Sequence, residues 1–203
     1  MSRTASGWTS MGIPVWLSWI CFAIFIVILL FHLYHMVAMR GQHRAWHVGH
    51  ILMALGMAWM FLPMHPLGIP VIVWQIAYAV AACLILAWCI WNWSQHRAVD
   101  FLWGTLLIGM LAMLYMYSFP GAANRYLSYV LVVYFVLEAI AWFIGAFGRT
   151  EKGRRRLLPD VLGPRASTAH PLAEAGLLSI RLTLGLMALG MGYMLFAMQS
   201  VVR

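Results

Sequence analysis

Long apolar runs separated by short polar breaks are the dominant pattern along this chain. Each run is about 20 residues long, which is the length that an α-helix needs to cross the apolar core of a bilayer. Prolines, glycines and charged residues fall in the breaks, where helices end. We therefore predict an all-α polytopic membrane protein, a six-transmembrane-helix bundle that forms one integral membrane domain over residues 1–203. The predicted spans are residues 14–39, 45–64, 71–93, 99–119, 124–147 and 177–198.

The composition agrees with a membrane protein. Hydrophobic residues make up 64% of the chain, charged residues make up 9%, and the mean hydropathy is +0.86. In soluble domains, charged residues alone account for about 25%. The first run is too long for the core of a signal peptide, so we predict a retained helix. The runs leave little chain for a separate soluble domain, and the function is expected in the membrane or in its loops.

The positive charges lie between the apolar runs, and they indicate an orientation. The formal net charge is +8, and most Lys and Arg residues follow the first, third and fifth runs. The positive-inside rule places these loops in the cytoplasm and both termini on the extracytoplasmic side. The longest basic loop, residues 148–176, would bring Arg154, Arg155 and Arg156 to anionic lipid headgroups. This distribution does not favour nucleic acid as a partner.

Residues 32–65 hold six of the eight histidines and six of the fifteen methionines. Two of these histidines lie near the end of the first span and two near the start of the second, so a helical hairpin would bring all four to one layer of the membrane. Imidazole and thioether groups together suit Cu(I). We therefore predict a site for a soft transition metal, with copper as the first candidate. The predicted ligands are His32, His35, Met36, His47, His50, Met53 and Met57.

The methionines of the second span continue from His50 on one helical face, because the steps to the following methionines are three or four residues. Met60, Met64 and His65 could form a relay from the site to the outer face. Methionine stripes are more often packing seams, because the side chain fills irregular gaps. We apply that interpretation to the methionines of the fourth and sixth spans, which lack histidine.

Two charged residues, Glu138 and Arg181, fall inside predicted spans, where a charge costs about 2.5–3.5 kcal/mol at the helix centre. One interpretation is an ion pair between them. The other has Glu138 bind the metal or orient a histidine ligand. A zinc site that includes Glu138 or Cys21 also stays open. No zinc-protease motif, nucleophile elbow or P-loop is present, so we predict no catalytic residues.

Two other functions compete with copper binding. Histidines on adjacent helices at matched depth could hold a single haem b as axial ligands. Alternatively, the protein could be a metal-free accessory or structural membrane subunit whose histidines hydrogen-bond one another. Small-residue pairs such as Ala54/Ala58 and Ala188/Gly192 fit close helix association, within one bundle, in a homo-oligomer or with a partner in a membrane complex.

The sequence HVGHILMALGMAWMFLPM, residues 47–64, resembles the second span of a family of small actinobacterial integral membrane proteins of unknown function. The resemblance lies in the pattern His-x-x-Met-x-x-x-Met, formed here by His50, Met53 and Met57. It implies a multi-pass helical bundle in a bacterial plasma membrane and supplies no activity. We predict a metal-binding membrane protein that transports, buffers or delivers copper.

Overall fold

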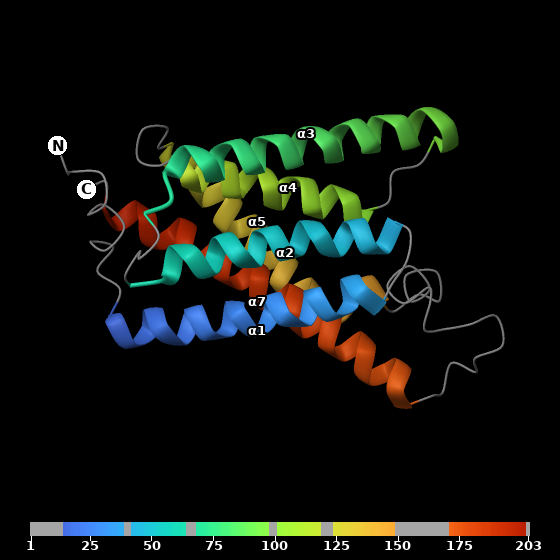
Figure 1. The fold of residues 1–203 in the computed structure, drawn as a ribbon, viewed down its shortest axis with the longest axis horizontal. Helices are drawn as coiled ribbons and strands as arrows, with labels where there is room; N and C mark the ends of the chain where they lie inside the picture. The colour runs from blue at the N-terminus through green and yellow to red at the C-terminus, as the bar shows by residue number, and fades with distance from the viewer. Residues whose placement is uncertain are drawn as a thin grey trace. The chain divides into compact units, whose positions relative to one another are not determined.

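The computed structural model describes residues 14–38, 42–63, 68–97, 101–118, 124–148 and 171–201. Within these ranges the regular structure is helical, as the sequence predicts (Figure 1). The six α-helices and one short 3₁₀ helix are α1 (Val15–Ala38), α2 (Gln42–Phe61), α3 (Val71–His96), α4 (Phe101–Tyr117), α5 (Arg125–Phe143), η1 (Ala146–Gly148) and α7 (Pro171–Val201).

Four of the described helices, α1, α3, α5 and α7, are long and apolar enough to cross a membrane. They point to a multi-pass membrane protein. The shorter α4 is apolar but has 17 residues, and α2 carries three histidines and an arginine in its first three turns. That α2 and α4 also cross the membrane therefore stays a prediction. The four apolar segments are Val15–Val37, Val71–Gln95, Arg125–Phe143 and Leu178–Gln199.

Most helix ends differ from the predicted ones by one to six residues, and three of these differences have a clear basis in the sequence. The second helix begins at Gln42, three residues early, and brings its polar residues into the helix. The fifth ends at Phe143 because Gly145 adopts a left-handed conformation with φ of 70°, and the amide of Gly145 donates to Trp142 O at 3.0 Å. The last helix begins at Pro171, six residues early, because proline needs no amide partner in a first turn.

The chain divides into two compact units, and each is described by itself. The first comprises Met1–Arg125 with Ala197–Arg203, and the second comprises Tyr126–Phe196. In the first unit α1 packs along α2, α3 packs along α4, and α2 also contacts α4. Figure 1 shows α1 and α2 side by side as an antiparallel hairpin.

Small residues on α2 set how closely its neighbours approach. A Cβ added at Gly49 would come 2.8 Å from a methyl carbon of Leu106 on α4. A Cβ at Gly56 would overlap the hydroxyl of Tyr78 and come 2.9 Å from the methyl carbon of Met113. Both glycines therefore allow contacts that any larger residue would obstruct.

Two tyrosines hydrogen-bond to the backbone of α2 from the neighbouring helices. The hydroxyl of Tyr78 on α3 donates to Leu52 O, and that of Tyr117 on α4 donates to Gly56 O, both at 2.9 Å. The two rings stack with centroids 5.5 Å apart. We call these four residues the tyrosine seam. It joins α2, α3 and α4, and it depends on Gly56 because that residue has no side chain in the way.

In the second unit, α7 packs closely on α5. A Cβ at Gly185 would come 2.6 Å from the ring of Phe143, and one at Gly192 would lie 3.5 Å from Cβ of Phe135. Small residues therefore line the contact. The predicted Ala188/Gly192 pair lies on this helix, where Gly192 serves packing inside the chain.

Candidate metal centre

Four imidazoles lie together on the α1–α2 hairpin, His32 and His35 on α1 and His47 and His50 on α2. In the sequence His35 and His47 each stand six positions from Gly41, and His32 and His50 each stand nine. Antiparallel helices with equal spacing from their turn place such residues at equal heights. The ring centroid of His32 lies 5.1 Å from that of His50 and 5.2 Å from that of His47, and the ring centroids of His35 and His47 are 5.4 Å apart. The predicted common layer is therefore present, and we call these four residues the histidine cluster.

Two rings of the histidine cluster bond to each other directly. Nδ1 of His32 lies 2.9 Å from Nδ1 of His47. A hydrogen bond between two imidazole nitrogens needs one that carries the proton and one that offers a lone pair. At least one of the two rings is therefore neutral, and neutral imidazole is the form that binds metals.

The other two rings are oriented by backbone carbonyls. Nδ1 of His35 lies 2.9 Å from Phe31 O, and Nδ1 of His50 lies 3.0 Å from Trp46 O. A carbonyl oxygen only accepts, so Nδ1 is the donor in both rings and the lone pair of the neutral ring is on Nε2. Histidines that bind metals typically have this arrangement, in which one ring nitrogen donates to a carbonyl and the other faces the ion.

His32 has unused hydrogen-bonding capacity. Its side chain is 0% exposed, and its Nε2 has no hydrogen-bond partner. A buried polar atom without a partner costs about 1–3 kcal/mol. His47 and His50 are also buried, and half-buried His35 stands at the margin of the cluster. The cluster therefore contributes a buried polar atom that a ligand could satisfy.

Aromatic side chains enclose the cluster. The ring of Trp46 lies 4.1 Å from that of His50 and 5.0 Å from that of His47, measured between centroids. Phe31 lies 4.1 Å from His35 in the same way. Trp46 is itself fixed, because its indole N–H donates to Leu102 O on α4 at 3.2 Å. These contacts hold the imidazoles in place and limit the access of water.

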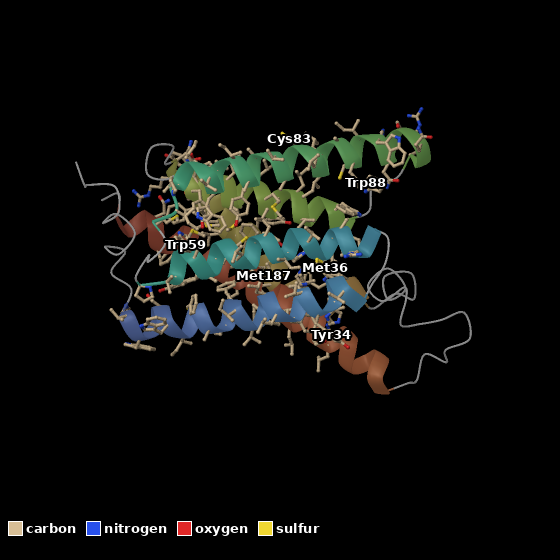
Figure 2. The ribbon with its side chains drawn as sticks, viewed as in Figure 1. Tyr34, Met36, Trp59, Cys83, Trp88 and Met187 are labelled. Carbon is tan, nitrogen blue, oxygen red and sulfur yellow. The ribbon has the colours of Figure 1, made fainter. Side chains whose placement is uncertain are left out.

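The predicted thioether ligands lie on the same two helices. Met53 and Met57 are buried on α2, with Met53 one turn beyond His50, and Met60 is buried further along. Met36 is half-buried, one turn beyond His32, and Figure 2 shows it on the side of α1 toward α2, whereas Tyr34 is turned away. Met64 and His65 of the predicted outer relay lie outside the described residues.

The arrangement limits which metal sites are available. Among the described residues, no group of three or more His, Cys, Asp or Glu side chains is placed to hold a metal ion. A site at the cluster therefore needs thioether ligands or a shift of the His32–His47 pair. Cys21 is a half-buried free thiol on α1, eleven residues before His32 and so about 16 Å away along the helix. Cys21 is therefore too far from the histidine cluster to be a ligand in the zinc alternative.

Glu138 and Arg181 lie in the second unit and do not pair with each other there. Arg181 donates from Nε to Trp142 O at 3.2 Å and from Nη2 to Phe143 O at 2.7 Å. Oε1 of Glu138 accepts from the indole N–H of Trp142 at 3.4 Å. The predicted ion pair between these two residues is not formed, and each side chain makes hydrogen bonds of its own.

Arg181 caps the end of α5, a role that the sequence analysis missed. The last carbonyls of a helix lack amide partners, and a cation there is favourable. Gly145 makes room, because a Cβ at that position would collide with the guanidinium group. A glycine that follows an apolar helix is a C-cap signal in the sequence. No sequence pattern, however, connects it to an arginine 36 positions later.

The comparisons with known proteins identify a family. The sequence model of a domain of unknown function, DUF5134, matches residues 42–198. The match includes His47, His50 and the methionines of α2, whereas His32, His35 and Met36 precede it. No curated protein and no solved structure matches the chain.

Proposed function

The chain belongs to the DUF5134 family, and we propose that it is a plasma-membrane protein of bacteria that binds one soft transition-metal ion, copper first, at the histidine cluster. The observation that carries the proposal is the orientation of the imidazoles. His35 and His50 donate Nδ1–H to carbonyls and so keep the Nε2 lone pair, and Nε2 of fully buried His32 has no partner. Each of these three rings therefore has an Nε2 atom that either lacks a proton or makes no hydrogen bond within the protein.

Copper is the preferred metal because methionines stand one helical turn from the imidazoles. Met36 and Met53 each follow a cluster histidine by one helical turn. Imidazole and thioether ligands together select Cu(I), whereas zinc sites are built from thiolate, imidazole and carboxylate. With six spans and basic loops in the cytoplasm, the cluster would lie toward the cytoplasmic side, suited to moving, buffering or delivering the ion.

A metal ion that bonds to the Nδ1 atoms of both His32 and His47 would require a small rearrangement of that pair. The two Nδ1 atoms are 2.9 Å apart, whereas an ion that bonds to both at about 2 Å would need them up to about 4 Å apart. Either the ion replaces the shared proton and the rings separate by about 1 Å, or it binds Nε2 atoms and leaves the pair intact. In the first case the proton moves to Nε2 of the donor ring, so no charge is added to the ligand set.

Elemental analysis of protein purified in a mild detergent tests the proposal. The wild type should retain or take up about one copper per chain, and His47→Ala combined with His50→Ala should abolish that binding, since both α2 imidazoles are removed. His170→Ala, which removes a histidine outside the cluster, is the control. The same copper content in the double variant and in the wild type contradicts the proposal.

A metal-free structural role is the second candidate, and the His32–His47 hydrogen bond favours it because that bond joins α1 to α2. Under this alternative the purified protein contains no stoichiometric metal, and the double variant loses stability. A haem b between the two helices has less support, since a porphyrin would have to separate the bonded rings. A Soret band in the spectrum of the same sample would favour haem over copper.

A further inference from the structure

Glu138 is a carboxyl group inside an apolar span. It lies in α5, thirteen residues after Arg125 and five before Phe143. One oxygen, Oε1, accepts from the indole N–H of Trp142 one turn later, and the hydroxyl of Tyr134 one turn earlier lies against the same carboxyl. The other oxygen, Oε2, is buried and has no hydrogen-bond partner. Half of the carboxyl group is therefore unsatisfied.

The described charged groups of α5 and α7 do not compensate Glu138. Arg181 is the one charged residue among the described side chains of α7, and its guanidinium donates to the carbonyls at the end of α5. Tyr193, the other titratable side chain described there, is exposed. On α5 itself, Arg125 is about 20 Å away along the helix. Among the described side chains of α5 and α7, an ionised carboxyl at this position would have one indole, one phenol and no cation as neighbours.

We propose that Glu138 is an intramembrane proton-binding site whose resting form is the neutral carboxylic acid. An isolated charge inside a span is costly, and so is a buried carboxylate oxygen without a donor. A proton on Oε2 removes the charge, which relieves the larger of these two costs. The proposal for Glu138 does not rest on the metal proposed at the histidine cluster.

The neighbours of Glu138 make proton binding reversible. When the acid group ionises, its proton passes to water and the negative charge stays on the carboxyl oxygens. Trp142 N–H and Tyr134 O–H are then donors to that charge from the same helix, one turn to either side. Donors to the charged form lower its cost. The arrangement is that of a group that holds a proton at rest and can release it.

Infrared spectroscopy of the full chain in lipid vesicles tests this proposal. At neutral pH the wild type should show the C=O stretch of a protonated carboxylic acid, which shifts in D₂O and is absent in Glu138→Gln. If Glu138→Gln instead loses a carboxylate band and its acid band is unchanged, Glu138 is ionised in the wild type and the proposal is wrong. The other carboxyls, all present in both proteins, cancel in the difference spectrum.

Two further variants keep the test valid if Glu138→Gln does not fold. Trp142→Phe removes a donor to the carboxylate, so the acid band should persist to higher pH than in the wild type. An acid band that disappears at an unchanged pH would contradict the assignment. Arg181→Gln should leave the acid band unchanged at neutral pH. If Arg181 were the charge partner, an acid band would appear only in this variant.

Discussion

Helix α2 carries buried polar contacts at two levels, and they differ in what they leave unsatisfied. In the tyrosine seam, the hydroxyls of Tyr78 and Tyr117 each donate to a carbonyl of α2 at 2.9 Å. In the histidine cluster, two rings bond to each other and two bond to carbonyls, yet Nε2 of His32 has no partner. Both hydroxyl groups of the tyrosine seam therefore have an acceptor, whereas the histidine cluster keeps a buried nitrogen atom without a partner.

This difference separates structure from binding. A satisfied hydrogen bond between helices needs no further molecule, and its loss is felt as stability. Unused nitrogen atoms in a dry, enclosed position cost stability, and a ligand that meets them offsets that cost. We therefore expect changes in the tyrosine seam to alter unfolding and leave copper unaffected. Changes in the histidine cluster should do the reverse.

The largest effect on stability is expected at Gly56. Gly56→Ala would force the new Cβ into the Tyr78 hydroxyl and toward Met113, so helices must shift and seam hydrogen bonds weaken. We expect a loss of about 3 kcal/mol in the free energy of unfolding, measured by denaturant titration in detergent micelles. Gly104→Ala is the control: its Cβ meets nothing within 4 Å, so this variant should gain about 0.5–1 kcal/mol. Equal effects at the two positions would contradict the close packing at Gly56.

Met53→Leu should weaken copper binding with little effect on folding. The change conserves volume and removes the thioether one turn beyond His50, so we expect the affinity for Cu(I) to fall about tenfold, or about 1.4 kcal/mol. Met113→Leu is the matched control, since Met113 is equally buried and lies on α4, which has no histidine. A competition titration with a Cu(I) chelator measures both. The same loss of affinity in the two variants would rule out a specific role for Met53.

Tyr117→Phe removes one hydroxyl of the seam and keeps the ring. Gly56 O also lies in the middle of a helix, so its carbonyl is not left without a partner, and the cost should be about 1 kcal/mol. Thermal unfolding measures the change, and copper stoichiometry should be the same as in the wild type. Loss of copper here would show that the two levels of α2 are coupled.

Among the variants that remove a hydrogen bond, His32→Leu combined with His47→Leu is expected to have the smallest effect on stability. Both partners of one hydrogen bond are replaced by apolar groups, and an unsatisfied Nε2 is removed, so unfolding should stay within about 1 kcal/mol of the wild type. Copper binding should be lost. A much larger loss of stability, with no metal in the wild type, would favour the metal-free structural role.

Some of this arrangement can be predicted from the sequence and some cannot. The common layer of imidazoles follows from their equal spacing about Gly41, because the turn of a hairpin fixes which positions face each other. The seam joins Tyr78 to Leu52 and Tyr117 to Gly56, 26 and 61 residues apart, and no local pattern contains that pairing. The Arg181 cap was missed for the same reason.

The ion-pair prediction illustrates a limit of composition. Two opposite charges in apolar helices are expected to meet, since each needs compensation. Arg181 instead satisfies carbonyls left open where α5 ends at Gly145, a helix end that lies earlier than predicted. The position at which α5 ends therefore decides which groups the guanidinium of Arg181 meets.

X-ray absorption of the protein loaded with Cu(I) is the most direct test of the central claim that the histidine cluster binds a soft metal. The account predicts scattering from at least two imidazole rings together with a sulfur neighbour, and a weaker sulfur contribution in Met53→Leu. A copper spectrum without imidazole scattering, or a protein that retains no copper after removal of excess metal, would contradict it.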